Sequence, residues 1–180
     1  KNQVTRYDDK RKTEIKKITT VEFDYIIISP GIDIYKCSLS KFLQDNSKKI
    51  YTDLDVFYSH HKQNNKITIT GTNGKSTTAK ILYEVLKDQK IDVRLVGNIG
   101  NPILSEKKVT KQTVFVIEAS SYQLEYSKLF KSNISLILNI SPDHLERHKT
   151  INKYISAKFK LVKNQSKKDF ALLNIKNFYI

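Results

Sequence analysis

The sequence of 180 residues contains no methionine and a single cysteine, Cys37. One cysteine cannot form a disulfide within the chain, which favours a reducing compartment. No apolar run approaches the roughly 20 residues that a membrane-spanning helix needs. The opening residues Lys1–Val4 also lack the apolar core of a secretion signal. Because methionine is missing even from position 1, we expect the sequence to begin inside a longer chain.

Arginine is scarce, with four residues, although the formal net charge is +14. A charge of that size is typical of proteins that bind nucleic acids. Here, however, the lysines are dispersed along the chain and few of them cluster with aromatic residues. We therefore interpret the charge as a solvated lysine-rich surface that attracts anionic nucleotides, and we expect no nucleic-acid partner. A basic nucleic-acid binder is the minor alternative.

The most informative stretch, Ile67–Thr78, begins with β-prone residues and ends with hydroxyl residues that open an amphipathic segment. Between them lies a turn bracketed by Gly71 and Gly74. A strand, a glycine loop and a helix start in this order can cradle a phosphate with backbone N–H groups. Lys75 would add a charge for the outer phosphates, and the Ser76 hydroxyl could ligate magnesium.

This loop departs from the usual phosphate-loop pattern. The pattern G-x-x-x-x-G-K-[ST] has its first glycine where this chain has Ile69, so the loop is the shorter form G-x-x-G-K-S. The alternative interpretation is a glycine-rich turn with a solvated lysine.

Short β-prone runs alternate with amphipathic segments along most of the chain. The predicted strands are Phe23–Ile28, Lys49–Thr52, Lys66–Thr70, Val93–Val96, Thr113–Glu118, Ile134–Ile140 and Phe170–Leu173. The predicted helices are Ser38–Asp45 with Ser38 as N-cap, Asp53–His60, Ser76–Gln89, Ser121–Lys128 and Ile151–Asn164. Residues 1–20 are interpreted as an irregular segment or an edge strand. The alternation predicts an α/β fold with a mainly parallel sheet and a domain boundary near residues 51–54.

Polar residues follow several of the predicted strands: Ser29, Thr70, Gly71, Asn98, Glu118, Asp143 and His144. In a parallel sheet these strand ends share one edge, where ligands bind. A lysine, hydroxyls, a carboxylate, an amide and an imidazole along one crevice suit metal-assisted phosphoryl transfer. Glu118 ends a run of four apolar residues, which favours a magnesium ligand over a surface or helix-capping acid.

Other reactive residues carry weaker signals. His144 and His148 lie four apart and could hold zinc, but no cysteine or third clustered histidine supports that site. The pair His60–His61 is most simply a solvated surface pair. Ser120–Ser121 lacks the G-x-S-x-G elbow of a hydrolase nucleophile. Composition alone predicts that Lys158 is a solvated lysine.

Six motifs occur in this order along the chain: Ser29–Gly31, Thr70–Thr77, Gly97–Pro102, Glu118–Glu125, Leu138–His148 and Tyr154–Lys158. Together they resemble the Mur ligases of peptidoglycan synthesis, over roughly residues 23 to 173. The strings E-x-S-S-Y-Q-L-E and G-N-I-G-x-P point to the branch of the family that adds D-glutamate. Folylpolyglutamate synthases share the phosphate loop but not those strings.

The resemblance implies a cytoplasmic, monomeric enzyme without a membrane span that uses ATP and two Mg²⁺ ions. It would join D-glutamate to UDP-N-acetylmuramoyl-L-alanine through an acyl phosphate. By this resemblance ATP is held by Gly71, Thr72, Asn73, Gly74, Lys75, Ser76 and Thr77. The resemblance implies the catalytic residues Lys75, Glu118, His144 and Lys158.

The same resemblance implies ligands for metal and substrate. Ser76 and Glu118 would bind one Mg²⁺, while Glu118, His144 and a carbamylated Lys158 would serve a second. Asn98 and Ser120 would contact the muramoyl-peptide substrate. The residues implied for the uridine nucleotide pocket are Ser29, Pro30 and Gly31.

The chain departs from the family at both ends. Residues 1–53 correspond to part of a Rossmann-like UDP-binding domain, and residues 54–180 to part of a central P-loop ATPase domain. By the resemblance, we expect these residues to leave out the opening of the first domain and the C-terminal domain of the family, and Ile175–Asn177 stands where the family usually has an acidic pair. We expect no ligase activity from these 180 residues alone. The alternatives are another Mur or folylpolyglutamate-type ligase and a catalytically inactive ATP-binding remnant.

Overall fold

Two parallel sheets organise the protein, which is described by a computed structural model at residues 3–8 and 15–180. A two-stranded sheet pairs β1 with β2, and a five-stranded sheet has the order β4-β5-β3-β6-β7. Every strand pair is parallel, as the sequence predicts. The strands are β1 Ile26–Ile27, β2 Ile50–Tyr51, β3 Lys66–Thr70, β4 Val93–Gly97, β5 Val114–Glu118, β6 Ile134–Ile137 and β7 Phe170–Leu173.

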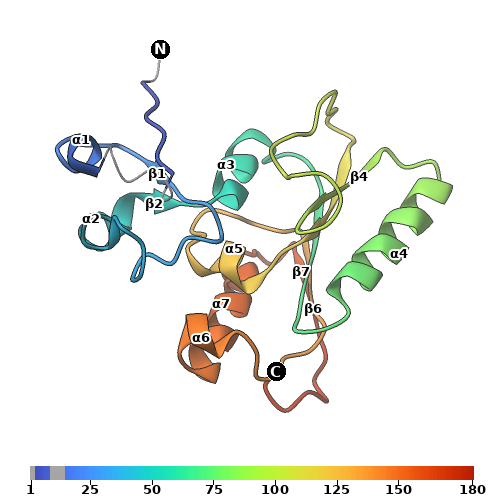
Figure 1. Ribbon diagram of the computed structural model, residues 1–180. Coiled ribbons are helices and arrows are strands. Elements are labelled where there is room, and N and C mark those ends of the chain that lie inside the picture. The colour runs from blue at the N-terminus through green and yellow to red at the C-terminus, as the bar shows by residue number, and fades with distance from the viewer. Residues whose placement is uncertain (1–2, 9–14) are drawn as a thin grey trace.

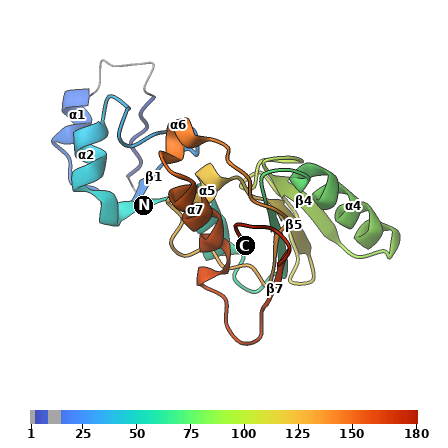
Figure 2. The same ribbon diagram turned by 90° about the horizontal axis from the view of Figure 1, so that it is seen from below.

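Helices cover both faces of the five-stranded sheet. Helix α4 packs on one face, and α5 and α7 lie on the other (Figures 1 and 2). The helices are α1 Ile15–Thr19, α2 Ser40–Asp45, the 3-10 helix η2 Ser47–Lys49, α3 Asp53–His60, α4 Lys75–Asp88, α5 Ser121–Glu125, α6 Leu145–His148 and α7 Ile151–Lys163. Within the described ranges, no helix is long and apolar enough to cross a bilayer.

The N-terminal part differs most from the sequence prediction. Residues 15–19 form a helix instead of an irregular segment or edge strand, and this helix buries Ile18. The predicted strand Phe23–Ile28 shortens to Ile26–Ile27, the two residues that pair with β2. Helix α2 begins at Ser40 with Leu39 at its N-cap, so the prediction of Ser38 as N-cap is wrong.

The central elements follow the prediction more closely, since their hydrophobic periodicity is strong. Strands β3 and β7 and helix α3 have the predicted bounds. Helix α5 stops at Glu125, three residues early, and the short helix α6 was not predicted. Strand β6 ends at Ile137 instead of Ile140, because the residues after it contact the loop that follows β3.

Two apolar layers enclose the sheet. On the α4 side, Ile69, Ala79, Val93 and Val116 are buried together. On the other side a larger cluster includes Leu124 of α5 and Leu161 of α7, among other residues. Along α4, Ala79 is fully buried, whereas Val85 is 52% exposed.

The two histidines at the end of α3 differ in exposure, since His61 is half-buried. His60 is exposed, as predicted. The ring of His61 instead lies 4.8 Å from the ring of Phe57 and 5.3 Å from that of Phe115. The interpretation of a fully solvated pair is therefore wrong for His61, because the chain turns back toward the core after α3.

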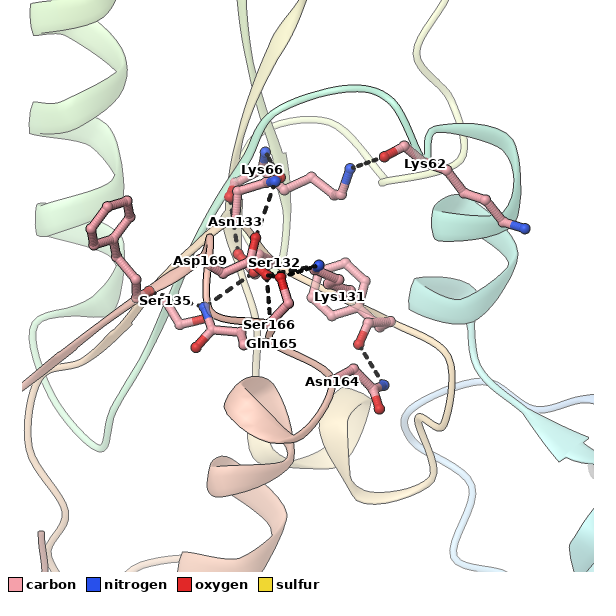
Figure 3. A network of polar contacts seen from close by, with 12 residues as sticks. Lys62, Lys66, Lys131, Ser132, Asn133, Ser135, Asn164, Gln165, Ser166 and Asp169 are labelled. Atoms are coloured by element: carbon pink, nitrogen blue, oxygen red, sulfur yellow. Dashed lines mark hydrogen bonds and ion pairs between the residues drawn. The ribbon is translucent and has the colours of Figure 1, made fainter.

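A polar network closes the end of the sheet where β3 begins (Figure 3). The Lys66 side chain is 1% exposed and donates a 2.7 Å hydrogen bond to the carbonyl of His61 and another to that of Asn64. Burial lowers the pKa of Lys66 to about 8. The backbone N–H of Lys66 donates to Asn133, 3.0 Å away, and Lys131 forms a 2.7 Å ion pair with Asp169. This network ties β3 to the segments before β6 and β7, away from the glycine loop.

Candidate active site

The glycine loop connects the end of β3 at Thr70 to the start of α4 at Lys75. Gly74 has φ +82°, a left-handed conformation that glycine adopts without strain. Gly71 has φ +154°, and a side chain there would also meet Leu138 Cβ at 3.2 Å, so this position also favours glycine. The first N–H groups of α4 have no intrahelical acceptor, and the helix dipole makes this end attractive to anions.

Two lysine side chains bind carbonyls of this loop. Lys75 Nζ donates to the carbonyl of Thr72, and Lys158 Nζ donates to the carbonyl of Gly71, both at 2.7 Å. Lys158 therefore reaches the loop from α7. The two lysines lie close enough for the charge of one to affect the other.

Lys158 is a buried lysine, with a side chain on the inner face of α7 and an exposure of 1%. Its ammonium lies over the ring of Tyr154, 4.6 Å from the centroid. Burial, and then the charge of Lys75, lowers the pKa of Lys158 to about 7. The composition-based interpretation of a solvated lysine is wrong, because this position faces the loop and not the solvent. A lysine partly uncharged at neutral pH is also a potential nucleophile.

Glu118 ends β5 as a buried carboxylate with an exposure of 1%. Its Oε1 accepts a 2.9 Å hydrogen bond from the side-chain amide of Asn98. Its Oε2 is buried and accepts no hydrogen bond from any residue that the structure describes. A buried carboxylate oxygen without a donor is unfavourable unless a cation or another ligand joins it. The predicted crevice therefore contains an acceptor available for a cation.

One cavity of about 640 Å³ brings together seven of the predicted site residues. Its wall includes Pro30, Gly31, Lys75, Asn98, Ser120, His144 and Lys158. Glu118 and Ser76 lie outside this wall, although Glu118 bonds to Asn98 within it. Ser29 lines a separate cavity of about 630 Å³ in the N-terminal part, so the structure does not group Ser29 with Pro30 and Gly31 at the first cavity.

The two histidines of the α6 segment have different environments. The side chain of His144 is 44% exposed, and the residue has φ +53°. His148 is buried and its Nε2 lies 3.0 Å from the Ser121 hydroxyl. Burial, followed by electrostatic repulsion from neighbours that include Arg147 and Lys158, lowers the pKa of His148 to about 4. Across the described part of the chain, no three His, Cys, Asp or Glu residues gather as a metal-binding group.

The cavity wall also includes residues that the sequence predictions for the site missed, among them Asp53 and Tyr154. Asp53 accepts a 3.3 Å hydrogen bond from the Gln123 amide, and burial raises the pKa of Asp53. Tyr154 lies with its hydroxyl 3.2 Å from Thr72 Oγ1. The sequence pattern places Tyr154 among the apolar residues of α7. Its phenolic oxygen is the one feature that could have indicated a polar contact. Asp53 lies in the first turn of α3, where acidic residues are common, so no sequence pattern indicated a role at the site.

Ser120 has a structural role beside its place in the wall. It caps α5, with its hydroxyl accepting from the backbone N–H of Gln123 at 3.2 Å. In turn, Oε1 of Gln123 accepts a 3.1 Å hydrogen bond from the backbone N–H of Ser120. This reciprocal capping box fixes the turn from β5 to α5 and holds both side chains at the cavity.

Comparison with known proteins adds a family. The Mur ligase middle domain model matches residues 69–180. The UDP-N-acetylmuramoylalanine--D-glutamate ligase of Rickettsia bellii is 38% identical over 165 residues, which cover 92% of this chain and 36% of that protein. The ligase of the same name from Lachnoclostridium phytofermentans is 40% identical over 161 residues, covering 88% and 35%. The chain thus spans about a third of the length of these curated relatives.

Solved structures share the fold at lower identity. UDP-N-acetylmuramate-alanine ligase from Thermotoga maritima is 21% identical with a TM-score of 0.54, covering 87% of this chain and 36% of that one. UDP-N-acetylmuramate:L-alanyl-gamma-D-glutamyl-meso-diaminopimelate ligase from Neisseria meningitides is 12% identical with a TM-score of 0.60, covering 92% and 56%. At these identities the likeness concerns the fold.

Proposed function

The chain belongs to the Mur ligase family, and we propose that it forms part of an ATP-dependent ligase that joins D-glutamate to UDP-N-acetylmuramoyl-L-alanine. The observation that carries this proposal is one cavity whose wall combines Lys75 of the glycine loop, the buried Lys158 and the Asn98 amide bonded to Glu118. Two lysine side chains and a side-chain amide thus line a space large enough for a substrate, and the amide contacts the Glu118 carboxylate.

The proposed reaction proceeds in two steps. The alanyl carboxylate attacks the γ-phosphorus of ATP, the bond from that phosphorus to the bridging oxygen breaks, and ADP leaves. The amine of D-glutamate then attacks the acyl phosphate carbon, and the tetrahedral intermediate expels phosphate as the nitrogen loses a proton. Phosphorylation converts a poor leaving group into a good one, while the site must neutralise several crowded anions.

The phosphates of ATP would be bound by the loop and the first turn of α4. The amides of Gly74, Lys75, Ser76 and Thr77 have no intrahelical acceptor, and this supports their use for an anion. Lys75 would leave the carbonyl of Thr72, which it now contacts at 2.7 Å, and bind the outer phosphates. Gly71, Thr72 and Asn73 would shape the loop.

Magnesium fits the residues at the end of β5. The partnerless Oε2 of Glu118 is a hard oxygen donor, which Mg²⁺ prefers. We propose that Ser76, Glu118, His144 and Lys158 hold two ions. When bound, Mg²⁺ would neutralise phosphate charge. Asn98 orients Glu118 by its hydrogen bond.

Lys158 fits this set only after modification, because an ammonium does not ligate a cation. We propose that its neutral amine adds CO₂ and loses a proton, which gives a carbamate anion. A pKa of about 7 leaves a substantial neutral fraction at neutral pH, which supports this step. The carbamate oxygens would then be available to Mg²⁺.

The substrate contacts follow from the cavity wall. We propose that Asn98 and Ser120 bind the muramoyl-peptide part and that Pro30 and Gly31 bind the uridine nucleotide part, since all four line the cavity. Ser29 would act from the neighbouring cavity. The division into a partial Rossmann-like UDP-binding unit at 1–53 and a partial ATP-binding unit at 54–180 belongs to the same proposal.

Binding of a nucleotide tests the proposal directly. We expect the chain to bind ATPγS in the presence of Mg²⁺, and Lys75→Ala to weaken this binding by about tenfold or more. Lys80→Ala on the exposed side of α4 is the matched control and should bind as the wild type does. An equal loss in both variants, or no ATPγS binding by the wild type, would contradict the proposal.

Turnover separates the remaining alternatives. Phosphate release with UDP-N-acetylmuramoyl-L-alanine should be measured with a panel of amino acids. Because the chain spans about a third of the length of its relatives, we expect ATP binding without turnover. Turnover that depends on an amino acid other than D-glutamate would identify a different ligase of this type.

A further inference from the structure

Three successive carbonyls of the glycine loop are each held by a side-chain donor. Lys158 donates to the carbonyl of Gly71 and Lys75 to that of Thr72. The third carbonyl, that of Asn73, accepts a 3.0 Å hydrogen bond from Nδ2 of Asn139. Both lysines also have proposed roles toward phosphate or metal, and these roles compete with their contacts to the loop. Asn139 is neutral and has no such role, so its contact persists.

Asn139 holds the loop at two further points. Its Oδ1 accepts a 2.9 Å hydrogen bond from the backbone N–H of Asn73, and its backbone carbonyl accepts one of 2.9 Å from the N–H of Thr72. Just before it, Leu138 N–H donates to the carbonyl of Thr70 at 3.0 Å. The ladder between β3 and β6 therefore continues beyond both strands. The side-chain amide of Asn139 bonds to both the backbone N–H and the backbone carbonyl of Asn73. It therefore extends the ladder by one more pair of hydrogen bonds.

This pairing determines the direction of one more backbone group. In a planar trans peptide the N–H points opposite to the C=O. Because the carbonyl of Asn73 points at Asn139, the N–H of Gly74 in the same peptide unit points away from Asn139. Within the described ranges that N–H has no protein acceptor. It is also the first of the helix-start amides available to an anion.

Gly74 lowers the energetic cost of rotating the peptide unit that precedes it, which would change the direction of its N–H. Rotation of a peptide unit that precedes glycine is inexpensive, since glycine populates positive and negative φ alike. Gly74 has φ +82°, which the neighbouring α4 does not by itself require. The amide of Asn139 supplies a donor and an acceptor to one residue, and this two-point contact opposes the rotation.

We propose that Asn139 is a positioning residue that locks the peptide between Asn73 and Gly74, so that the Gly74 N–H is presented to a phosphate before the nucleotide binds. The inference rests on the proposed function only in taking the anion to be a phosphate of ATP. It predicts that affinity for ATP depends on a residue that does not touch ATP.

Amide exchange of the wild-type protein, followed by NMR without ligand, tests the lock itself. The N–H groups of Thr72 and Asn73 should be protected, whereas that of Gly74 should exchange fast and slow down only when ATPγS is added. Fast exchange at Thr72 and Asn73 without ligand would overturn the proposal. So would an unchanged Gly74 amide in protein that is saturated with ATPγS.

Substitution tests the consequence for binding. Asn139→Ala should remove the protection of Asn73 and weaken ATPγS binding by about tenfold, the effect of one or two lost hydrogen bonds. Asn164→Ala is the matched control, because the Asn164 amide donates to the carbonyls of Lys128 and Phe130 at 2.8 and 2.9 Å, away from the loop. It should lower the thermal midpoint without changing the affinity.

Equal affinity losses in Asn139→Ala and Asn164→Ala, or none in Asn139→Ala, would overturn the proposal. Failure of the proposed function has a different signature. In that case the wild type binds no ATPγS, while the amides of Thr72 and Asn73 remain protected. If Asn139→Ala does not fold, the exchange measurement on the wild type still decides.

Discussion

The side-chain amide of Asn98 donates a 2.9 Å hydrogen bond to Oε1 of Glu118, and the other oxygen of this buried carboxylate has no partner among the described residues. Asn98 follows β4 and Glu118 ends β5, so parallel pairing of these neighbouring strands brings the two side chains together. The backbone N–H of Asn98 also donates to the carbonyl of Glu118 at 2.9 Å. The pair fixes the carboxylate and leaves one oxygen available to a cation.

Glu118→Gln should therefore abolish the dependence of ATP affinity on Mg²⁺. The substitution preserves the shape but removes the negative charge that would hold the ion. Affinity for ATP without Mg²⁺ should stay the same or rise, because a carboxylate no longer repels the phosphates. Calorimetric titrations with and without Mg²⁺ measure both quantities. Glu84→Gln, on the exposed face of α4, is the control and should keep the dependence of ATP affinity on Mg²⁺. If Glu118→Gln also keeps this dependence, the assignment of Glu118 as a Mg²⁺ ligand is wrong.

Asp55→Ala should destabilise the protein by about 3 kcal/mol, because several donors lose one buried acceptor. Asp55 is 2% exposed. Its Oδ1 accepts from the Ser127 hydroxyl at 2.9 Å and from the N–H groups of Lys128, Leu129 and Phe130 at 2.8 to 3.0 Å. Urea unfolding measures the change. Asp88→Ala, at an exposed aspartate, should change the free energy of unfolding by less than about 0.5 kcal/mol.

The carboxylate of Asp169 should make stability sensitive to acid. Burial acts to raise its pKa, but hydrogen bonds from Lys131 and Ser166 outweigh it and hold the pKa at about 2. The unfolded value is about 3.9. The ionised form thus stabilises the fold above pH 4, and this contribution disappears as the pH falls toward 2. Thermal midpoints of wild type and Asp169→Asn should differ at pH 6 and converge near pH 2; a constant difference would disprove the linkage.

Lys158 should carry a carbamate when bicarbonate is present. With ¹³C-labelled bicarbonate, the wild type should show a carbamate carbon resonance that Lys158→Arg lacks. The signal should weaken below pH 7, because protonation of the amine removes the nucleophile. Lys153→Arg, at an exposed position on the same helix, should keep the signal. A wild type that binds Mg²⁺ and ATP with an unmodified Lys158 would exclude the carbamate.

The central elements could be predicted from the sequence because their signals are local. Strand β3 and helix α3 have the predicted bounds, since a β-prone run and an amphipathic period each identify one type of element. The two-stranded sheet and α1 were predicted poorly, because a strand needs a partner and a short helix needs a surface to pack on. Both requirements depend on segments distant in the sequence, so the local residue pattern does not predict them.

The sequence by itself determined the chemistry of this protein: a glycine loop with Lys75, a carboxylate at the end of an apolar strand, and ordered motifs that resemble one family. Only the tertiary structure decided which of these groups meet. It buries Lys158 beside Lys75, buries His148 while His144 stays partly exposed, places Ser29 in another cavity and joins Asn139 to the loop. The physical reason is that burial and hydrogen-bond partners depend on the packing of distant segments, whereas residue type and periodicity are local properties of the chain.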